Sequence, residues 1–294
     1  MQNKQYQFLK DKWVKKHKSL QKSLSEKHRS SFQWLSENSK QLALGSLGGL
    51  MILTSPLHKT SPNPQIRVAS EEAQKIDNKV FLISDLSNIL PSEVRPLTSE
   101  EETKIGDILS KSFGMKVNTV LNGLRLNRSY GYIGAEQHLR RYPGDTMSSH
   151  FDPPAGGQED AEKFYSSGMA PGLGAWGYFA TSSSQMTPED SAREKYYLAV
   201  QTFLAPDFNS RVAEYRDFFK FRKMLVVNPE NGKSVVAVIG DAGPAEWTGK
   251  HLGGSPEVMK HLERVDGTQK GPVLYYFLDD PNDLVPLGPI ETVQ

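Results

Sequence analysis

The chain has 294 residues, of which 37% are hydrophobic, and a formal net charge of +1, a composition typical of a globular protein with one large domain or two small ones. It has no cysteine, which excludes disulfides, thiolate catalysis and cysteine-type zinc sites. The charge is uneven: residues 1–40 hold ten Lys/Arg against three Asp/Glu, a net +7, so the rest carries −6. The acidic body argues against a nucleic-acid groove. We predict no nucleic-acid partner and no cofactor.

The front of the chain predicts a membrane anchor. Residues 41–57, QLALGSLGGLMILTSPL, form an apolar run whose core is about as long as the hydrophobic region of a signal peptide. The basic arm 1–40 would stay cytoplasmic by the positive-inside rule, and 58–78 would link the anchor to an exported body. We therefore expect an envelope protein, membrane-anchored or secreted, with cleavage of the run left open. The alternative for 41–57 is a buried core helix. The arm itself fits either an amphipathic helix on anionic lipid or a solvated tail.

Residues 79–170 are expected to form a small α+β region of unknown role. Residues 80–86, VFLISDL, predict a short strand. Residues 98–114 predict a helix, because Thr98 and Glu101 can form a capping box ahead of apolar residues that recur on one face.

A hairpin and a domain boundary are predicted next. Residues 116–134 predict a hairpin that turns at Asn122-Gly123, the dipeptide preferred in two-residue turns. Residues 153–175 are rich in Gly and Pro and predict a loop. We place the start of a C-terminal domain, 171–294, in this loop.

A possible metal site lies between these elements. His138, Asp145 and His150 offer borderline and hard ligands within a short span, a set that suits zinc. The spacing from His138 to Asp145 is similar to that of the zinc D,D-carboxypeptidases of cell walls, although their flanking Ser and distant His-x-His are absent. The alternative is structural, because Pro143-Gly144-Asp145 is also an ordinary turn.

From Trp176 onward the predicted elements are mostly strands. Residues 234–240, SVVAVIG, are apolar throughout and predict a strand buried on both faces. Ser255 as N-cap and Pro256 at the first helical position predict the start of a helix. The other strands are expected at 177–181, 223–229 and 271–280, and the helices at 187–203 and 255–262.

This order of elements resembles a known family. The order is a strand, an Asn-Gly turn, a buried strand that ends in Asp-x-Gly-Pro, then Thr-Gly-Lys and a Ser-Pro helix. This order is similar to that of the double-psi β-barrel of rare lipoprotein A (RlpA) and the expansins. The resemblance covers 174–280 and is most specific over 226–262. It implies an α+β chain with a six-stranded double-psi β-barrel, whose open groove holds a polysaccharide, commonly peptidoglycan or cellulose. Some members are lytic transglycosylases, whereas expansins loosen walls without net hydrolysis.

The resemblance also implies site residues. Asp241, Gly243 and Pro244 match the family's Asp-x-Gly-Pro, and Ser255 matches the serine that opens the helix. The family's Asp-Leu-Ser reads Gly253-Gly254-Ser255 here, so the acid tied to activity is missing. The matches for the glycan-binding segments are Thr248-Gly249-Lys250, with Lys for Arg, and Tyr178, Phe179 and Thr181.

Cleavage of a glycosidic bond needs a positioned acid. Asp241 can serve if burial raises its pKa, with Glu246 as the spare candidate; the alternative is that Asp241 only orders the turn. Trp247 is a candidate sugar-stacking platform or a partly buried packing residue, and His251 a candidate hydrogen-bonding partner or an ordinary surface residue.

We therefore expect an envelope protein whose barrel binds or remodels peptidoglycan or another wall glycan. One alternative is a lytic transglycosylase that uses Asp241 as its acid. The other is a metal-dependent wall peptidase at His138, Asp145 and His150.

Overall fold

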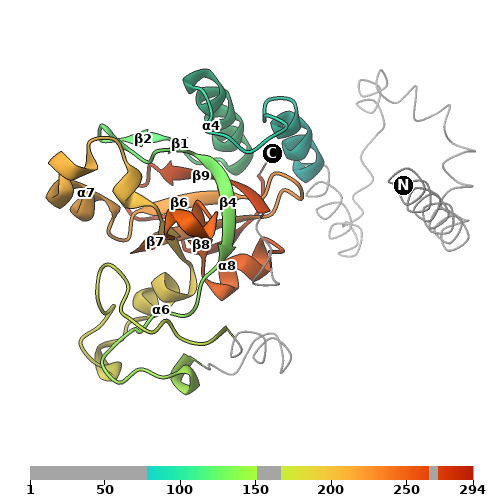
Figure 1. Cartoon of the computed structure of the whole chain (residues 1–294). Helices are drawn as coiled ribbons and strands as arrows, with labels where there is room; N and C mark the ends of the chain where they lie inside the picture. The colour runs from blue at the N-terminus through green and yellow to red at the C-terminus, as the bar shows by residue number, and fades with distance from the viewer. Residues whose placement is uncertain (1–77, 151–166, 265–270, 294) are drawn as a thin grey trace, which may run out of the picture. The chain divides into compact units, whose positions relative to one another are not determined.

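The computed structural model describes residues 78–150, 167–264 and 271–293 (Figure 1). All of them belong to one compact unit that begins at Asn63. The basic arm, the apolar run and all but the last residue of the expected linker lie outside the described residues. Within the described ranges, no helix is both long and apolar enough to cross a membrane.

Six strands close into a barrel of mixed direction. Around the ring, β9 pairs with β4, then β8, β5, β7 and β6 follow, and β6 pairs again with β9. The pairs β4–β8 and β5–β7 are parallel, and the other four are antiparallel. The strands are β4 (Tyr130–Ala135), β5 (Tyr197–Val200), β6 (Lys223–Val227), β7 (Ser234–Ala242), β8 (Leu252–Gly254) and β9 (Gly271–Leu278). The expected six-stranded barrel within an α+β chain is therefore confirmed.

Two short strands extend the sheet beyond this ring. Strand β1 (Val117–Asn118) pairs with β9, and β10 (Gly288–Ile290) pairs with β7. A separate hairpin, β2 (Val120–Leu121) and β3 (Leu124–Arg125), turns at Asn122-Gly123 as predicted. Both turn residues have positive φ, which Asn and Gly tolerate better than other residues.

Strand β7 is buried on both faces, as its unbroken apolar sequence predicted. Val235, Ala237 and Ile239 belong to the cluster that fills the barrel. Val236 and Val238 alternate with them and join clusters on the outer side of the wall. A strand with two apolar faces needs cover outside the barrel as well as inside.

Two helices cover one side of the barrel. Helix α4 (Ser99–Phe113) begins at a complete capping box of Thr98 and Glu101, as predicted. The strand expected at 80–86 is wrong, because residues 78–87 form a helix. Leu82 and Leu86 lie four residues apart, so they share one helical face and pack with α4 on the outer wall.

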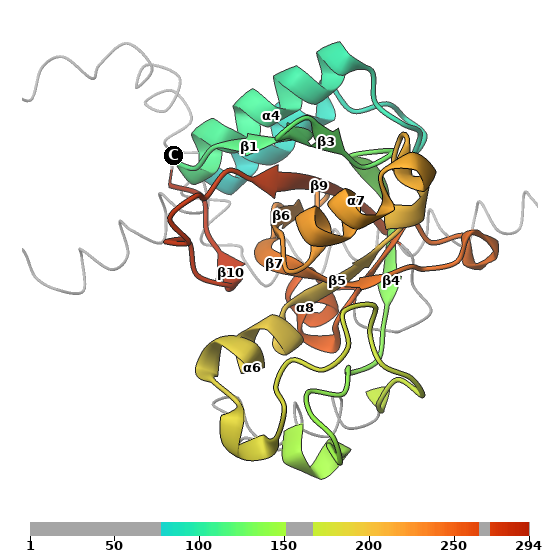
Figure 2. The ribbon, with the colours of Figure 1, turned by 90° about the vertical axis from the view of Figure 1, so that its left-hand side faces the viewer.

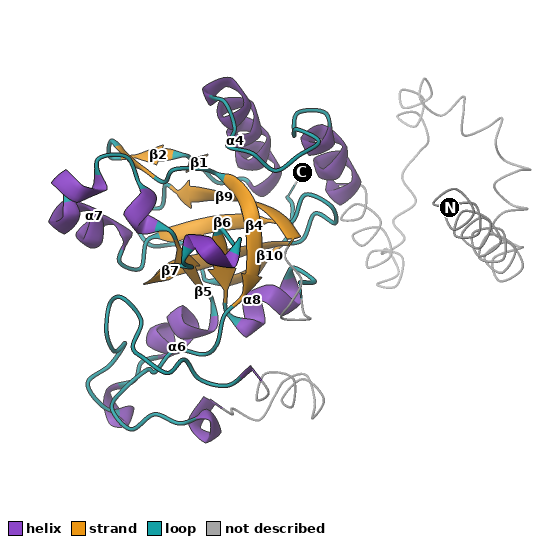
Figure 3. Ribbon diagram, in the orientation of Figure 1, coloured by secondary structure: helices purple, strands orange, loops and turns teal. Residues whose placement is uncertain are grey.

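The opposite side carries shorter helices and long loops. Figures 2 and 3 show α4 on one side of the strands, with α6 (Pro188–Lys195) and the loops beside it on the other. Helix α8 (Pro256–His261) starts at Ser255, whose hydroxyl accepts a hydrogen bond from the backbone N–H of Val258, as the sequence predicted. Helix α7 (Val212–Phe219) was not anticipated.

Three elements differ from expectation. The helix expected over 187–203 ends at Lys195, because the next residues form the buried strand β5. The strand expected at 177–181 is a loop, which starts at Gly177 with a φ of 81°. Strand β4 lies ahead of residue 171, so the barrel takes one of its six strands from the region expected to precede it.

Candidate functional site

The outer face of β5 is covered by two loop segments, residues 136–146 and 167–182. Tyr197 and Ala199 on this face pack with Leu139 from the first segment. The segments are joined by backbone hydrogen bonds, among them those from the N–H groups of Phe179 and Ala180 to the carbonyl of Arg141. The first segment contains His138 and Asp145, and the second is hydrogen-bonded to Asp241 through Ala175.

Asp241 lies near the end of β7, in register with Ala199. Its Oδ1 accepts hydrogen bonds from the backbone N–H groups of Ala175 and Ala242, each at 2.7 Å. Burial raises the pKa of Asp241 above its ordinary value, although these two bonds act in the opposite direction. The carboxylate therefore orders the chain at this turn, and its pKa is shifted in the direction that a general acid requires.

A second carboxylate lies on the other side of Ala199, which is also in register with Gly253 on β8. The side chain of Glu136 lies over Gly253, where a Cβ would collide with its carboxylate. Glu136 Oε1 accepts a hydrogen bond from Lys250 Nζ at 2.7 Å. The space left by the missing side chain at position 253 is thus occupied by an acid from the residue that directly follows β4. No local sequence pattern predicts this placement.

The loop after Pro244 carries four of the candidate glycan-binding residues. Trp247 is 89% exposed, so the interpretation of this side chain as a packing residue is wrong. His251 Nδ1 accepts a hydrogen bond from the backbone N–H of Tyr132 at 2.9 Å, and burial lowers the pKa of His251 to about 4. Thr248 and Lys250 lie between them, and Glu246 is exposed on the same turn.

The remaining glycan candidates lie on the covering loop. Tyr178 and Thr181 belong to the covering segment 167–182, whereas Trp247 lies on the loop after Pro244. Tyr178 is 41% exposed. This loop is anchored to Asp241 through Ala175 and to β7 through Trp176, whose indole N–H donates to the Ile239 carbonyl at 3.0 Å. The structure thus divides the predicted glycan residues between two loops.

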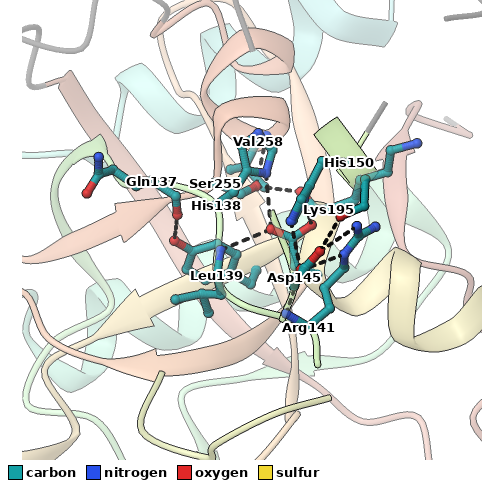
Figure 4. Close-up of polar contacts among 12 residues, drawn as sticks. Gln137, His138, Leu139, Arg141, Asp145, His150, Lys195, Ser255 and Val258 are labelled. Carbon is teal, nitrogen blue, oxygen red and sulfur yellow. Dashed lines mark hydrogen bonds and ion pairs between the residues drawn. The ribbon is translucent and has the colours of Figure 1, made fainter. Parts of the chain in front are cut away.

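His138 and His150, labelled in Figure 4, lie close together. Both contact a residue that sequence analysis missed, Glu194 of α6. His138 Nδ1 lies 3.0 Å from Glu194 Oε1, and His150 Nδ1 lies 3.3 Å from Glu194 Oε2. The side chains of these three residues are 2–4% exposed. Burial opposes the ionisation of Glu194, but hydrogen bonds from the two imidazoles outweigh it and lower the pKa of Glu194 to about 2.

Asp145, the third predicted metal ligand, lies beside this cluster rather than within it. Its Oδ2 is 2.9 Å from His150 Nε2, and its two oxygens accept hydrogen bonds from the guanidinium of Arg141, each at 3.1 Å. Ser149 Oγ donates to Oδ1 at 2.6 Å. Burial opposes the ionisation of Asp145, but these bonds hold its pKa well below its usual range. Asp145 therefore orients His150 (Figure 4).

Glu257, at the second position of α8, completes the buried polar groups on this side. Burial raises the pKa of Glu257 to about 7, and the charges of His138 and Glu194 act on it. Glu257 Oε2 and His138 Nε2 are both buried and, within the described part of the chain, have no hydrogen-bond partner. An unpaired buried polar atom is costly, so these two atoms call for an explanation.

Comparison of the chain with protein-family models, with curated proteins and with solved structures found no match in any of the three.

Proposed function

We propose that the barrel binds a cell-wall polysaccharide, with peptidoglycan as the first candidate, and remodels it without cutting it. The observation that carries the proposal is the exposure of Trp247, at 89%, on the loop that directly follows Asp241-Ala-Gly-Pro244. An exposed indole buries little surface in the folded chain, but it offers a large flat face on which a sugar ring can stack. Aromatic residues that gain burial only on binding are typical of binding hot spots.

The polar groups around Trp247 support the same function. Lys250 lies three residues further along and is paired with Glu136, and His251 is held against Tyr132 with its ring stacked at 5.8 Å between centroids. Ammonium, carboxylate and phenol groups can all hydrogen-bond to sugar hydroxyls. Thr248, the next residue in the chain after Trp247, adds a hydroxyl that donates to the Ala245 carbonyl and can accept from a sugar.

The finer description of the fold belongs to the same proposal. The closed ring of six mixed strands and the Asp-Ala-Gly-Pro that ends β7 support a double-psi barrel of the RlpA and expansin kind. With that fold, residues 41–57 would serve as the signal-anchor, and the barrel would act on the exported side, secreted or held at the membrane.

Sedimentation with purified peptidoglycan sacculi tests the proposal. The full chain is mixed with sacculi and centrifuged, and the bound fraction is measured for the natural protein, Trp247→Ala and Phe203→Ala. Phe203 is a matched control, because it is also an exposed aromatic residue, at 40%, on the short 3-10 helix Thr202–Leu204. We expect Trp247→Ala to weaken binding at least about tenfold and Phe203→Ala to leave it unchanged. Equal binding of all three proteins, or no binding by the natural protein, would reject the proposal.

A lytic transglycosylase is the second candidate, favoured by the raised pKa of the half-buried Asp241 and by Glu136 on the same face. Such an enzyme needs one acid to protonate the leaving oxygen, because a sugar hydroxyl supplies the attacking group. Mass spectrometry of the soluble products decides the case. Anhydro-sugar fragments released by the natural protein but not by Asp241→Asn would establish a transglycosylase that uses Asp241. Glycan that stays intact with both proteins would show that the barrel binds glycan without cleaving it.

A further inference from the structure

We infer that His138, His150 and Glu194 form a binding site for one divalent transition-metal ion, with Zn²⁺ as the best match. The site lies in the described part of the chain, between the loop 136–150 and helix α6, and it is independent of Trp247 and its loop. Two imidazole nitrogens and one carboxylate are a donor set that zinc takes in proteins.

The separations between the ligand atoms fit a single ion. Each residue offers one ligand atom, and these atoms all lie within 4.8 Å of one another. Glu194 Oε1 lies 3.0 Å from His138 Nδ1, and the other carboxylate oxygen, Oε2, lies 3.3 Å from His150 Nδ1. In a tetrahedral zinc site with bonds of about 2.0–2.1 Å, ligand atoms lie about 3.3 Å apart. An ion can therefore enter with small movements of the three side chains.

The surroundings hold these ligands in the orientation that a metal requires. Asp145 Oδ2 lies 2.9 Å from His150 Nε2, so a proton on Nε2 is held by the carboxylate and Nδ1 is left free to coordinate. Arg141 and Ser149 in turn fix Asp145. Glu194 Oε1 also accepts a hydrogen bond from the backbone N–H of Leu139 at 3.1 Å.

The unpaired Nε2 of His138 is a second, independent indication. It is buried in a side chain only 2% exposed. Coordination through Nδ1 would place the proton on Nε2, and a metal-bound histidine usually donates that proton to a carboxylate. Glu257 Oε2 is also buried and without a partner, and its charge acts on His138. Glu257 is therefore the candidate acceptor for that proton, and a small movement of its side chain would have to form the hydrogen bond.

Metal titration of the full chain tests the inference. The protein is treated with EDTA, the chelator is removed, and Zn²⁺ is added in competition with a chromogenic chelator. We expect one equivalent to bind. Glu194→Gln and His150→Ala should each weaken binding by more than the 10- to 100-fold typical of an outer-shell change, and Asp145→Asn by about 10- to 100-fold. Asp241→Asn and His251→Gln are the controls, a carboxylate and an imidazole outside the site, and should bind as the natural protein does.

Cobalt spectroscopy provides a readout that does not depend on the variants' folding. Co²⁺ in a four-coordinate site with nitrogen and oxygen ligands gives visible absorption bands much stronger than those of the hydrated ion. We expect such bands from the natural protein at one equivalent, and their loss when Zn²⁺ is added. Absence of these bands, or equal zinc affinity of the natural protein and a folded Glu194→Gln, would overturn the inference and leave a hydrogen-bonded network of Glu194 with His138 and His150.

Discussion

Asp241 Oδ1 accepts a 2.7 Å hydrogen bond from the backbone N–H of Ala175, so a carboxylate at the end of one strand fixes a loop 66 residues earlier in the chain. The same oxygen accepts the N–H of Ala242. The side chain of Asp241 thus holds the covering loop, residues 167–182, against the barrel wall.

The role of Asp241 in folding can be separated from its charge. Asp241→Ala removes the acceptor for two backbone N–H groups, so it should lower the free energy of unfolding by about 1–3 kcal/mol. Asp241→Asn keeps a carbonyl oxygen that can accept both bonds, and its loss should be smaller than that of the alanine variant. Urea unfolding of the two variants measures the difference. Equal losses would show that the two N–H groups do not depend on this oxygen.

Glu136 and Gly253 should be coupled energetically. Gly253→Ala places a methyl group where the Glu136 carboxylate lies and would displace it from Lys250. In a Glu136→Ala background that space is empty, so the same substitution should be tolerated. A double-mutant cycle measured by urea unfolding should give a coupling energy of at least about 1 kcal/mol. Additive effects would mean that Glu136 moves aside at no cost.

His251 should make stability depend on pH below neutrality. Its pKa is lowered to about 4 in the folded chain from an ordinary value near 6.5. The unfolded chain therefore binds the proton first as pH falls, so stability present above about pH 6.5 is lost as pH falls towards 4. Because the side chain is partly exposed, we expect a loss of about 1–2 kcal/mol.

His251→Asn supplies the control for this prediction. Its side-chain oxygen can accept the N–H of Tyr132 but does not titrate. Thermal unfolding between pH 4 and 7 should therefore show a smaller pH dependence for the variant than for the natural protein. Parallel curves for the two proteins would assign the dependence to other groups.

The helix at 78–87 should contribute to the outer core. Leu86 is fully buried against α4, so Leu86→Ala should cost about 2–5 kcal/mol through lost contacts and a cavity. Phe81, on the same helix, is 66% exposed, and Phe81→Ala should change the free energy of unfolding by less than about 0.5 kcal/mol. Chemical unfolding of both variants checks the contrast. A small effect at Leu86 would argue that this helix adds little to the fold.

Elements with local signals could be predicted from the sequence. The capping box of Thr98 and Glu101 and the turn at Asn122-Gly123 depend on residues a few positions apart. The unbroken apolar run of β7 predicted a strand buried on both faces for the same reason. The strand predicted at 80–86 is wrong because the apolar residues of this segment suit either element, whereas the four-residue spacing of Leu82 and Leu86 is helical.

The candidate sites depended on long-range contacts and could be predicted only in part. His138 and His150 were singled out because they lie close in sequence, whereas Glu194 is 56 residues from His138 and carries no local motif. The place of Glu136 over Gly253 depends on the pairing of β4 with β8, which no short pattern encodes. Asp145 was predicted to be a metal ligand, but its carboxylate hydrogen-bonds to the ring of His150 instead.

The closure of the ring has a consequence for expressing parts of this protein. Strand β4 pairs with β8 on one side and β9 on the other, and both partners come more than 100 residues later in the chain. A fragment that starts at residue 171 would lack β4 and would leave two strands with unpaired N–H and C=O groups. Exposed strand edges of this kind recruit other chains and lead to aggregation. A soluble barrel fragment must therefore begin ahead of Tyr130.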